Sequence, residues 1–169
     1  MGQFSVIVVC GSPGAGKSTY ARQLAEQRQA VLLDIDTVTD KLVRSALAAS
    51  GHKENDRDSD YFKRHFRGPI YDTLFDIARE NLARFDVIIV GPFTREIRDS
   101  FWPTRLQAAL GAPVEVHYVD CQPGVRRKRL VQRGASRDSA KIADWENYLL
   151  LHADGSPPIF PHIYVDTSD

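Results

Sequence analysis

Five runs of apolar residues along the chain predict the strands of a parallel sheet. Each run is bounded by Gly, Pro or Asp, and β-branched residues are frequent within it. Continuous apolar runs of this length are typical of strands that are buried on both faces of a sheet. The predicted strands are Phe4–Cys10, Ala30–Leu33, Val87–Val90, Val114–Val119 and the short Ile163–Val165.

The segments between these runs carry apolar residues at helical spacing. Strands that alternate with helices predict βαβ units, and therefore a three-layer α/β/α fold with helices on both faces of a five-stranded parallel sheet. Two polar or Gly- and Pro-containing stretches, Ser50–Asp60 and Ala153–Pro161, are expected to be loops. The predicted helices are Ser18–Arg28, Thr37–Ala49, Tyr61–Arg84, Ile97–Leu110, Val125–Arg133 and Ser139–Leu151.

The turn after the first predicted strand fits the phosphate-loop (P-loop) pattern G-x-x-x-x-G-K-[ST] in full, between a strand and a helix as the pattern requires. Its glycines let successive backbone N–H groups converge on phosphate oxygens, and the helix that follows points its positive dipole end at the same anion. We expect Lys17 to bridge the β- and γ-phosphates of ATP and Ser18 to give its hydroxyl to Mg²⁺. The residues expected to bind the nucleotide are Gly11, Ser12, Pro13, Gly14, Ala15, Gly16, Lys17, Ser18 and Thr19.

Two carboxylates, Asp34 and Asp36, follow the second predicted strand. Ligands of open parallel sheets bind beyond the carboxyl ends of the strands. Residues two apart on an extended chain point the same way, so we expect both carboxylates at one site. Asp34 is then expected to hold Mg²⁺ through water, and Asp36 to orient and deprotonate the acceptor hydroxyl. The structural alternative is that Asp36 caps the helix that follows it.

Gly91 follows the third predicted strand, where many P-loop proteins have the Walker B aspartate. The missing carboxylate argues against a motor-type ATPase. Gly91–Pro92 instead predicts a tight turn beneath the substrate. Arg95, a few residues further on, is expected either to reach an anionic substrate or to be an ordinary exposed arginine.

The most basic segment of the chain runs from Arg126 to Asp138. Arg129 and Arg133 share one helix face because they are four residues apart, and Gly134 is expected to end that helix. With Arg137 in the following loop, the segment predicts a lid over approximately residues 124–140 that places guanidinium groups on the phosphates and excludes water. The alternative is a solvated basic helix face.

Composition narrows the possible partners. The chain has 169 residues, of which 43% are hydrophobic and 26% charged, as expected of one soluble globular domain. Its 22 basic and 22 acidic residues balance, so no general attraction to nucleic acid or membranes is expected. The N-terminus has the pattern of a strand rather than of a leader. We expect a cytoplasmic monomer or homodimer with no membrane span and two buried thiols, Cys10 and Cys121.

The motifs GSPGAGKST, DID and RLVQRGASRD resemble those of the small P-loop kinases. That group includes gluconate, shikimate and chloramphenicol kinases, the polynucleotide 5′-kinase domain, zeta-type toxins and the AAA-like predicted kinases, and the resemblance runs from Phe4 to about Leu151. It implies Asp36 as base or substrate anchor. The lid arginines that it places on the phosphates are Arg129, Arg133 and Arg137, and the arginines that it places on the acceptor are Arg64 and Arg67. Because Gly91 replaces an acidic residue of some relatives, Mg²⁺ falls to Ser18 and Asp34.

These features predict an ATP- and Mg²⁺-dependent phosphotransferase that moves the γ-phosphoryl group to a hydroxyl of a small molecule. One alternative is a polynucleotide or toxin-like kinase that acts on a nucleotide-bearing acceptor. A neutral chain disfavours this alternative because proteins that track nucleic acid neutralise several phosphates. The other alternative is a regulatory P-loop ATPase, which the paired aspartates disfavour because a switch needs no base for an alcohol.

Overall fold

A five-stranded sheet forms the centre of the computed structural model, which describes residues 4–57, 59–135, 138–151 and 156–169. All four strand pairings are parallel, and the strand order is β2-β3-β1-β4-β5. The strands are Val6–Cys10 (β1), Val31–Asp34 (β2), Val87–Val90 (β3), Val114–Asp120 (β4) and Ile163–Asp166 (β5). The structure therefore confirms the predicted five-stranded parallel sheet.

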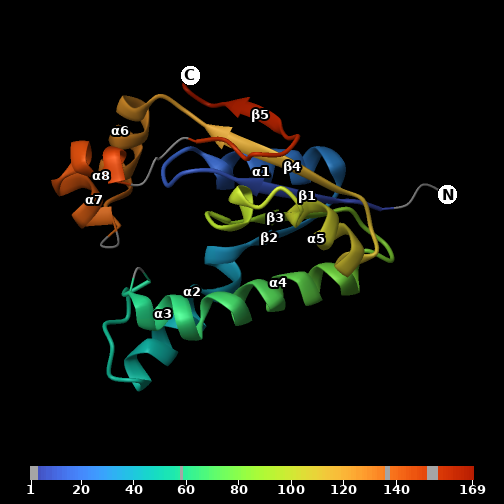
Figure 1. Ribbon diagram of the computed structural model, residues 1–169, viewed down its shortest axis with the longest axis horizontal. Coiled ribbons are helices and arrows are strands. Elements are labelled where there is room, and N and C mark those ends of the chain that lie inside the picture. The colour runs from blue at the N-terminus through green and yellow to red at the C-terminus, as the bar shows by residue number, and fades with distance from the viewer. Residues whose placement is uncertain (1–3, 58, 136–137, 152–155) are drawn as a thin grey trace.

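Helices lie on both faces of this sheet (Figure 1). The connection after each of the first four strands contains at least one helix, as parallel pairing requires. Within the described residues, no helix is long and apolar enough to cross a membrane. The helices are Lys17–Arg28 (α1), Ile35–Ala49 (α2), Asp60–His65 (α3), Arg67–Asn81 (α4), Glu96–Arg98 (the 3₁₀ helix η1), Trp102–Leu110 (α5), Pro123–Arg133 (α6), Ser139–Ala143 (α7) and Trp145–Leu151 (α8).

The central strand β1 divides the core into two layers. Val6 and Val8 pack with apolar residues of α2, α4 and α5, whereas Ile7 and Val9 pack with alanines of α1 on the other face. Because side chains alternate along a strand, a strand covered on both faces must be apolar throughout. This constraint explains why the β1 run has no polar position.

Two of the predicted helices are each two helices in the structure. The predicted helix Tyr61–Arg84 breaks at Phe66, and α4 begins at Arg67. Pro69 lies in the first turn of α4, where a missing backbone N–H is tolerated, whereas inside a continuous helix it would remove a hydrogen bond. The predicted helix Ser139–Leu151 is divided into α7 and α8 at Asp144. The backbone of Asp144 leaves the helical region, with φ −131° and ψ 66°.

The prediction of a helix that begins at Ile97 was also wrong. The structure has only the short η1 there, and α5 begins at Trp102 with Pro103 in its first turn. Proline is favoured in that first turn because it needs no intrahelical hydrogen bond there. Both cysteines, Cys10 and Cys121, are buried free thiols as expected.

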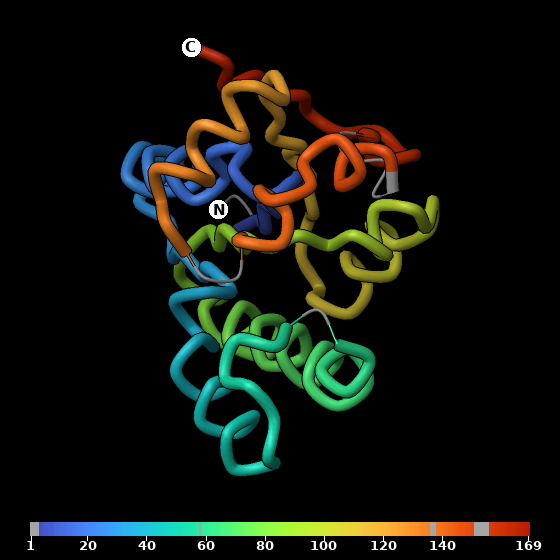
Figure 2. Tube along the Cα trace, turned by 90° about the vertical axis from the view of Figure 1, so that its left-hand side faces the viewer, coloured from blue at the N-terminus to red at the C-terminus, as the bar shows by residue number. Residues whose placement is uncertain are grey.

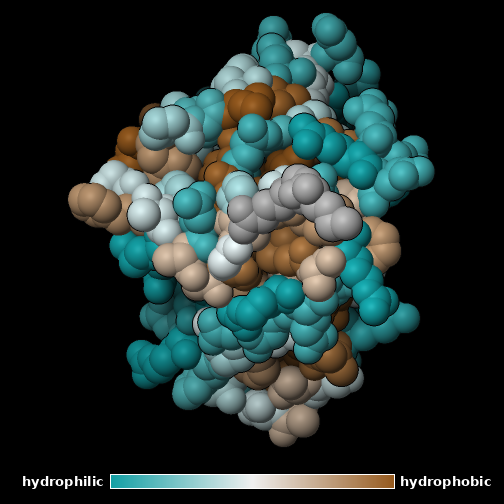
Figure 3. Space-filling view, turned by 90° about the vertical axis from the view of Figure 1, so that its right-hand side faces the viewer, coloured by the Kyte–Doolittle hydropathy of each residue, from teal (hydrophilic) through white to brown (hydrophobic). Residues whose placement is uncertain are grey.

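The two ends of the sheet differ in what surrounds them. At the carboxyl ends of the strands, the α2–α4 lobe and the α6–α8 lobe lie on opposite sides of the turn between β1 and α1 (Figure 2). The face seen from the other side carries polar side chains with separate apolar areas between them (Figure 3). The end with the two lobes is the end at which ligands of open α/β sheets bind.

Gly11, the first residue after β1, provides a test of this packing. Its φ is +135°, and a Cβ there would lie 2.0 Å from the carbonyl oxygen of Val119 on β4. We expect Gly11→Ala to lower the free energy of unfolding by about 2–5 kcal/mol, from backbone strain and overpacking together. Gly111→Ala is the matched control, because Gly111 also has positive φ (+66°) but no atom within 4 Å of its Cβ position. Urea unfolding measures both, and equal losses would contradict the proposed collision.

Candidate active site

A cavity of about 1740 Å³ opens at the carboxyl ends of the strands. The P-loop, the end of β2, the turn after β3, helices α3 and α4, and the α6–α8 lobe all contribute to its walls. Small-molecule sites usually occupy about 300–1,000 Å³. The cavity is therefore large enough for two such ligands.

The P-loop forms one wall of this cavity in a conformation that requires glycine. Gly14 and Gly16 have φ of +81° and +88°, and a Cβ on Gly14 would lie 3.0 Å from the carbonyl oxygen of Arg126. Helix α1 begins at Lys17, directly after Gly16, so its N-terminus carries no capping side chain. A glycine cradle that leads into a helix N-terminus suits a phosphate group. All the predicted nucleotide-binding residues of the loop line the cavity except Ala15, which is buried in the core behind it.

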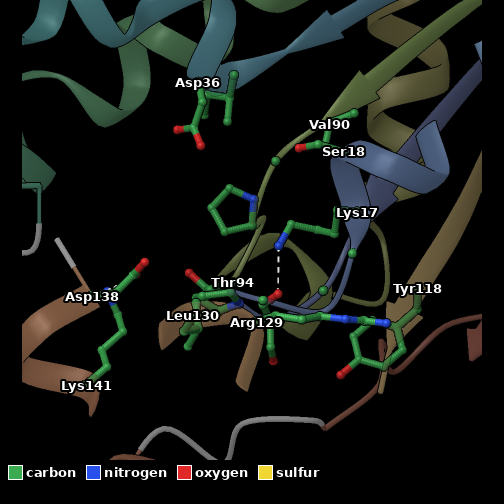
Figure 4. Close-up of a pocket in the computed structure, with 18 of the residues that line it drawn as sticks. Lys17, Ser18, Asp36, Val90, Thr94, Tyr118, Arg129, Leu130, Asp138 and Lys141 are labelled. Carbon is green, nitrogen blue, oxygen red and sulfur yellow. Dashed lines mark hydrogen bonds and ion pairs between the residues drawn. The ribbon is translucent and has the colours of Figure 1, made fainter. Parts of the chain in front are cut away.

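Lys17 is half-buried at the start of α1, and its Nζ donates a hydrogen bond to the carbonyl oxygen of Ser12 at 2.8 Å (Figure 4). Burial lowers the pKa of Lys17 to about 8, although the nearby Cys10, Asp36 and Asp34 act to raise it. A lysine whose ammonium form is penalised by burial gains strongly from an anionic partner. A bound phosphate would supply that partner.

Asp34 connects the P-loop helix to helix α2. Its Oδ2 accepts a hydrogen bond from Ser18 Oγ at 2.5 Å, and its Oδ1 accepts one from the backbone N–H of Asp36 at 3.0 Å. Asp34 is thus the N-cap of α2, so the alternative that Asp36 is the cap is wrong. The chain is also not extended through Asp36, which lies in the first turn of α2. The two carboxylates line one cavity because of this cap, not because of strand alternation.

The donor atoms at Ser18 and Asp34 fit a magnesium ion. A hydroxyl and a carboxylate are hard oxygen ligands, and Mg²⁺ is usually held by one or two carboxylates together with phosphates and waters. In the part of the chain that the structure describes, no group of three or more His, Cys, Asp or Glu side chains is placed to hold a metal ion by itself. The pair therefore suits an ion that arrives with the nucleotide.

Gly91 has no room for the carboxylate of a Walker B strand. A Cβ there would lie 2.9 Å from the ring of Phe93, which is fully buried and has a φ of +44°. The Phe93 ring is held between Tyr71 and Trp102, with centroid distances of 4.8 and 5.2 Å. Asp34 instead brings a carboxylate to Ser18 from β2. Strand β3 lies between β2 and β1. Asp34 is nevertheless level with the end of β1, because Asp34 pairs with Val90 of β3 and Val90 pairs with Val9 of β1.

Similarity to known proteins shows the family of this chain. The sequence profile of the AAA_33 family, described as an AAA domain, matches residues 6–152. The chain belongs to the AAA_33 family. No curated protein matches the chain in sequence.

Solved structures share the fold of this AAA_33 domain at low sequence identity. A candidate kinase from Chloroflexus aurantiacus superposes with a TM-score of 0.66 at 19% identity, over 99% of this chain and 90% of that one. A sugar kinase from Janibacter sp. gives 0.60 at 18% identity, over 96% and 85%. A gluconokinase from Sinorhizobium meliloti gives 0.52 at 16% identity, over 100% and 86%. The AAA_33 domain therefore has the fold of the small P-loop kinases.

Two of the predicted lid arginines line the cavity. Arg133 donates from Nε and Nη2 to Oδ2 of the buried Asp138, at 3.0 and 2.5 Å. Arg129 donates to Oγ1 and the carbonyl oxygen of Thr167, at 3.0 and 2.5 Å. Figure 4 shows Arg129 below the P-loop and Asp138 on the far side of the cavity from Ser18. Arg137, the third predicted lid arginine, lies outside the described residues.

The predicted acceptor-side arginines separate into one that lines the cavity and two that do not. Arg67 lines it, donates from Nη2 to Glu96 Oε2 at 2.6 Å, and lies over the Tyr71 ring at 5.1 Å. Arg64 and Arg95 are exposed and are not part of the cavity wall. The sequence pattern did not distinguish them because contacts that form only in the folded chain decide which arginine lines the cavity.

Several cavity residues had no signal in the sequence. Arg57 is the most informative, because it comes from the polar stretch predicted only as a loop and yet contacts Asp36. The composition of this polar stretch resembles that of any solvated loop. Arg57 comes close to α2 only when the chain is folded. The other unpredicted lining residues include Phe62, Lys63, Tyr71, Thr94, Arg98 and Lys141.

The lowered pKa of Lys17 has a consequence for stability. Its folded pKa, about 8, is below the ordinary 10.5, so its charge destabilises the fold below about pH 8, and this cost disappears as the pH rises towards 10.5. We therefore expect Lys17→Met to unfold at higher urea than wild type near neutral pH without nucleotide. The difference should shrink as the pH approaches 10.5. A difference that stays constant with pH would show that the effect does not come from the ammonium group.

Proposed function

We propose that this AAA_33 domain is an ATP-dependent phosphotransferase that moves the γ-phosphoryl group to a hydroxyl of a small acceptor. The observation that carries the proposal is that the P-loop lysine and the Asp36 carboxylate face the same cavity (Figure 4). The first is suited to hold a phosphate chain, and the second to take a proton from an alcohol. A regulatory ATPase needs only the first.

On the nucleotide side, the P-loop N–H groups and Lys17 would hold the β- and γ-phosphates. Ser18 and Asp34 would hold Mg²⁺, which when bound neutralises charge that develops on the phosphates. Arg133 lies at the end of α6 in the proposed lid, where its guanidinium group is kept in place by Asp138. Its proposed role is to stabilise the transferring phosphoryl group once the lid is closed over both ligands.

On the acceptor side, Asp36 would orient the hydroxyl and accept its proton. The side chain of Asp36 is 43% exposed, so a ligand can reach its carboxylate. As the bond from the hydroxyl oxygen to the γ-phosphorus forms, the bond from that phosphorus to the β–γ bridging oxygen breaks, and ADP leaves with the electron pair. Arg67 is proposed to contact the acceptor because it lines the same cavity as Asp36.

The experiment measures ADP release from ATP and Mg²⁺ with a panel of acceptors. The panel begins with D-gluconate and simple sugars, because a gluconokinase and a sugar kinase share this fold. It continues with shikimate, an aminoglycoside, a nucleoside and a 5′-hydroxyl oligonucleotide. The oligonucleotide tests the nucleotide-bearing acceptor, and release that no acceptor increases is the result expected of a regulatory ATPase.

The expected cytoplasmic location stays a prediction.

Asp36→Asn tests the role of the base. We expect acceptor-dependent ADP release to fall by roughly 10²–10⁴-fold, the usual scale of general-base catalysis. ATP affinity and thermal stability should stay close to wild type, since Asp34 and not Asp36 caps α2. Asp60→Asn is the matched control, because Asp60 is also a first-turn acid but lies on α3 outside the cavity wall.

The Asp36 variant can also contradict the proposal. If Asp36→Asn keeps its activity while remaining folded, Asp36 is not the base, and the acceptor site lies elsewhere. If Asp60→Asn loses as much activity as Asp36→Asn, the loss comes from the charge of the lobe and not from the cavity.

A further inference from the structure

Arg57 lies in the wall of the cavity although it comes from the loop between α2 and α3. Its side chain is only 16% exposed, which is unusual for an arginine of a polar loop. Nη1 is 3.4 Å from Asp36 Oδ1, and Nη2 is 3.0 Å from Asp40 Oδ1. Asp36 and Asp40 are four residues apart on α2, so one guanidinium group spans two successive turns of the helix.

The guanidinium group of Arg57 also contacts an aromatic ring. Its central carbon lies 6.0 Å from the centre of the Phe62 ring on α3. The planar, rigid fork of an arginine loses little freedom when two acceptors and an aromatic ring surround it. Arg57 therefore joins α2, the loop and α3 at the position of the proposed base.

Arg44, an arginine of α2 itself, provides a comparison. Arg44 also contacts Asp40, at 4.0 Å, and contacts Glu54 of the loop at 2.9 Å. Arg44 and Glu54 are more than half exposed, so their ion pair contributes little to stability. Among the described contacts, Arg44 has none with Asp36. It tests whether the loop needs anchoring to α2 in general, whereas Arg57 tests the contact with Asp36.

We propose that Arg57 is a positioning residue that fixes the orientation of the Asp36 carboxylate for phosphoryl transfer. A contact at Oδ1 limits rotation about the Cβ–Cγ bond and therefore sets the direction of Oδ2. Arg57 acts through Asp36 and need not touch the reacting atoms. This inference rests on the proposed function, since it assumes that Asp36 takes the proton of the acceptor.

The charged groups around Asp36 come from several elements. Asp40 lies one turn further along α2, Asp34 precedes it in the chain, and Lys17 is close enough on α1 to interact with it electrostatically. Arg57 contacts Asp36 from the loop. Removal of the Arg57 side chain should therefore change the orientation of the Asp36 carboxylate and have a smaller effect on the nucleotide site. A misplacement of about 1 Å at a reacting group can lower a rate by about 10²-fold.

The test is a double-mutant cycle between Arg57→Gln and Asp36→Asn. The readout is ADP release from ATP and Mg²⁺ with D-gluconate and with the other compounds of the acceptor panel. If none of them increases release above hydrolysis of ATP alone, that hydrolysis is the readout, with water as the acceptor. We expect Arg57→Gln to lower kcat by about 10- to 100-fold, with the KM values for ATP and acceptor within about twofold of wild type.

Three further measurements separate positioning from other roles. In the Asp36→Asn background, Arg57→Gln should have no further effect, because a residue that acts through Asp36 has nothing left to orient. Arg57→Lys keeps the charge but loses the planar guanidinium group, so its rate should lie between those of Arg57→Gln and wild type. Arg44→Gln should stay within about twofold of wild type.

Other outcomes overturn the inference in distinguishable ways. A raised acceptor KM with unchanged kcat would make Arg57 a binding residue for the acceptor. Effects that multiply in the double variant would show that Arg57 acts independently of Asp36, and an equal loss in Arg44→Gln would assign the effect to loop anchoring. If Asp36→Asn retains full activity, or if wild type releases no ADP under any condition, the proposed function fails first and the positioning role fails with it.

Discussion

The carboxylate of Asp34 is the group on which the arrangement of the site depends. One oxygen accepts a hydrogen bond from the Ser18 hydroxyl at the start of α1. The other accepts a hydrogen bond from the backbone N–H of Asp36 and so caps α2. A single buried side chain thereby fixes the distance between the phosphate loop and the candidate base. If Asp34 were lost, α2 would lose its cap and Ser18 its partner at the same time.

The parallel sheet makes this contact possible. The carboxyl ends of β1, β3 and β2 lie at one level, so the P-loop and Asp34 meet across β3 even though their strands are not neighbours. The buried ring of Phe93 occupies the space next to Gly91, which explains why the acidic group comes from β2. Gly91, Pro92 and Thr94 of the turn after β3 line the cavity, whereas the Phe93 ring is buried in the core.

The parts of the fold that depend on local sequence signals could be predicted. The strands, the order of elements and the glycine conformations of the P-loop follow from apolar runs and from a motif in its required context. The capping role of Asp34 and the place of Arg57 in the cavity could not be predicted in the same way. Each depends on a choice between similar local conformations or on contacts between residues far apart in the chain. For the same reason the exposed Arg64 and the cavity-lining Arg67 looked equivalent in the sequence.

The identity of the phosphorylated product tests the central claim most directly. Phosphorus NMR of wild-type protein with ATP, Mg²⁺ and each acceptor of the panel separates transfer from hydrolysis, because a phosphomonoester and inorganic phosphate have different resonances. Phosphotransfer predicts that the γ-phosphate signal of ATP is replaced by a new phosphomonoester signal with one of the acceptors. If ATP is consumed and inorganic phosphate is the only new signal with every acceptor, the protein is an ATPase, and the assignment of Asp36 as the base for an alcohol is contradicted.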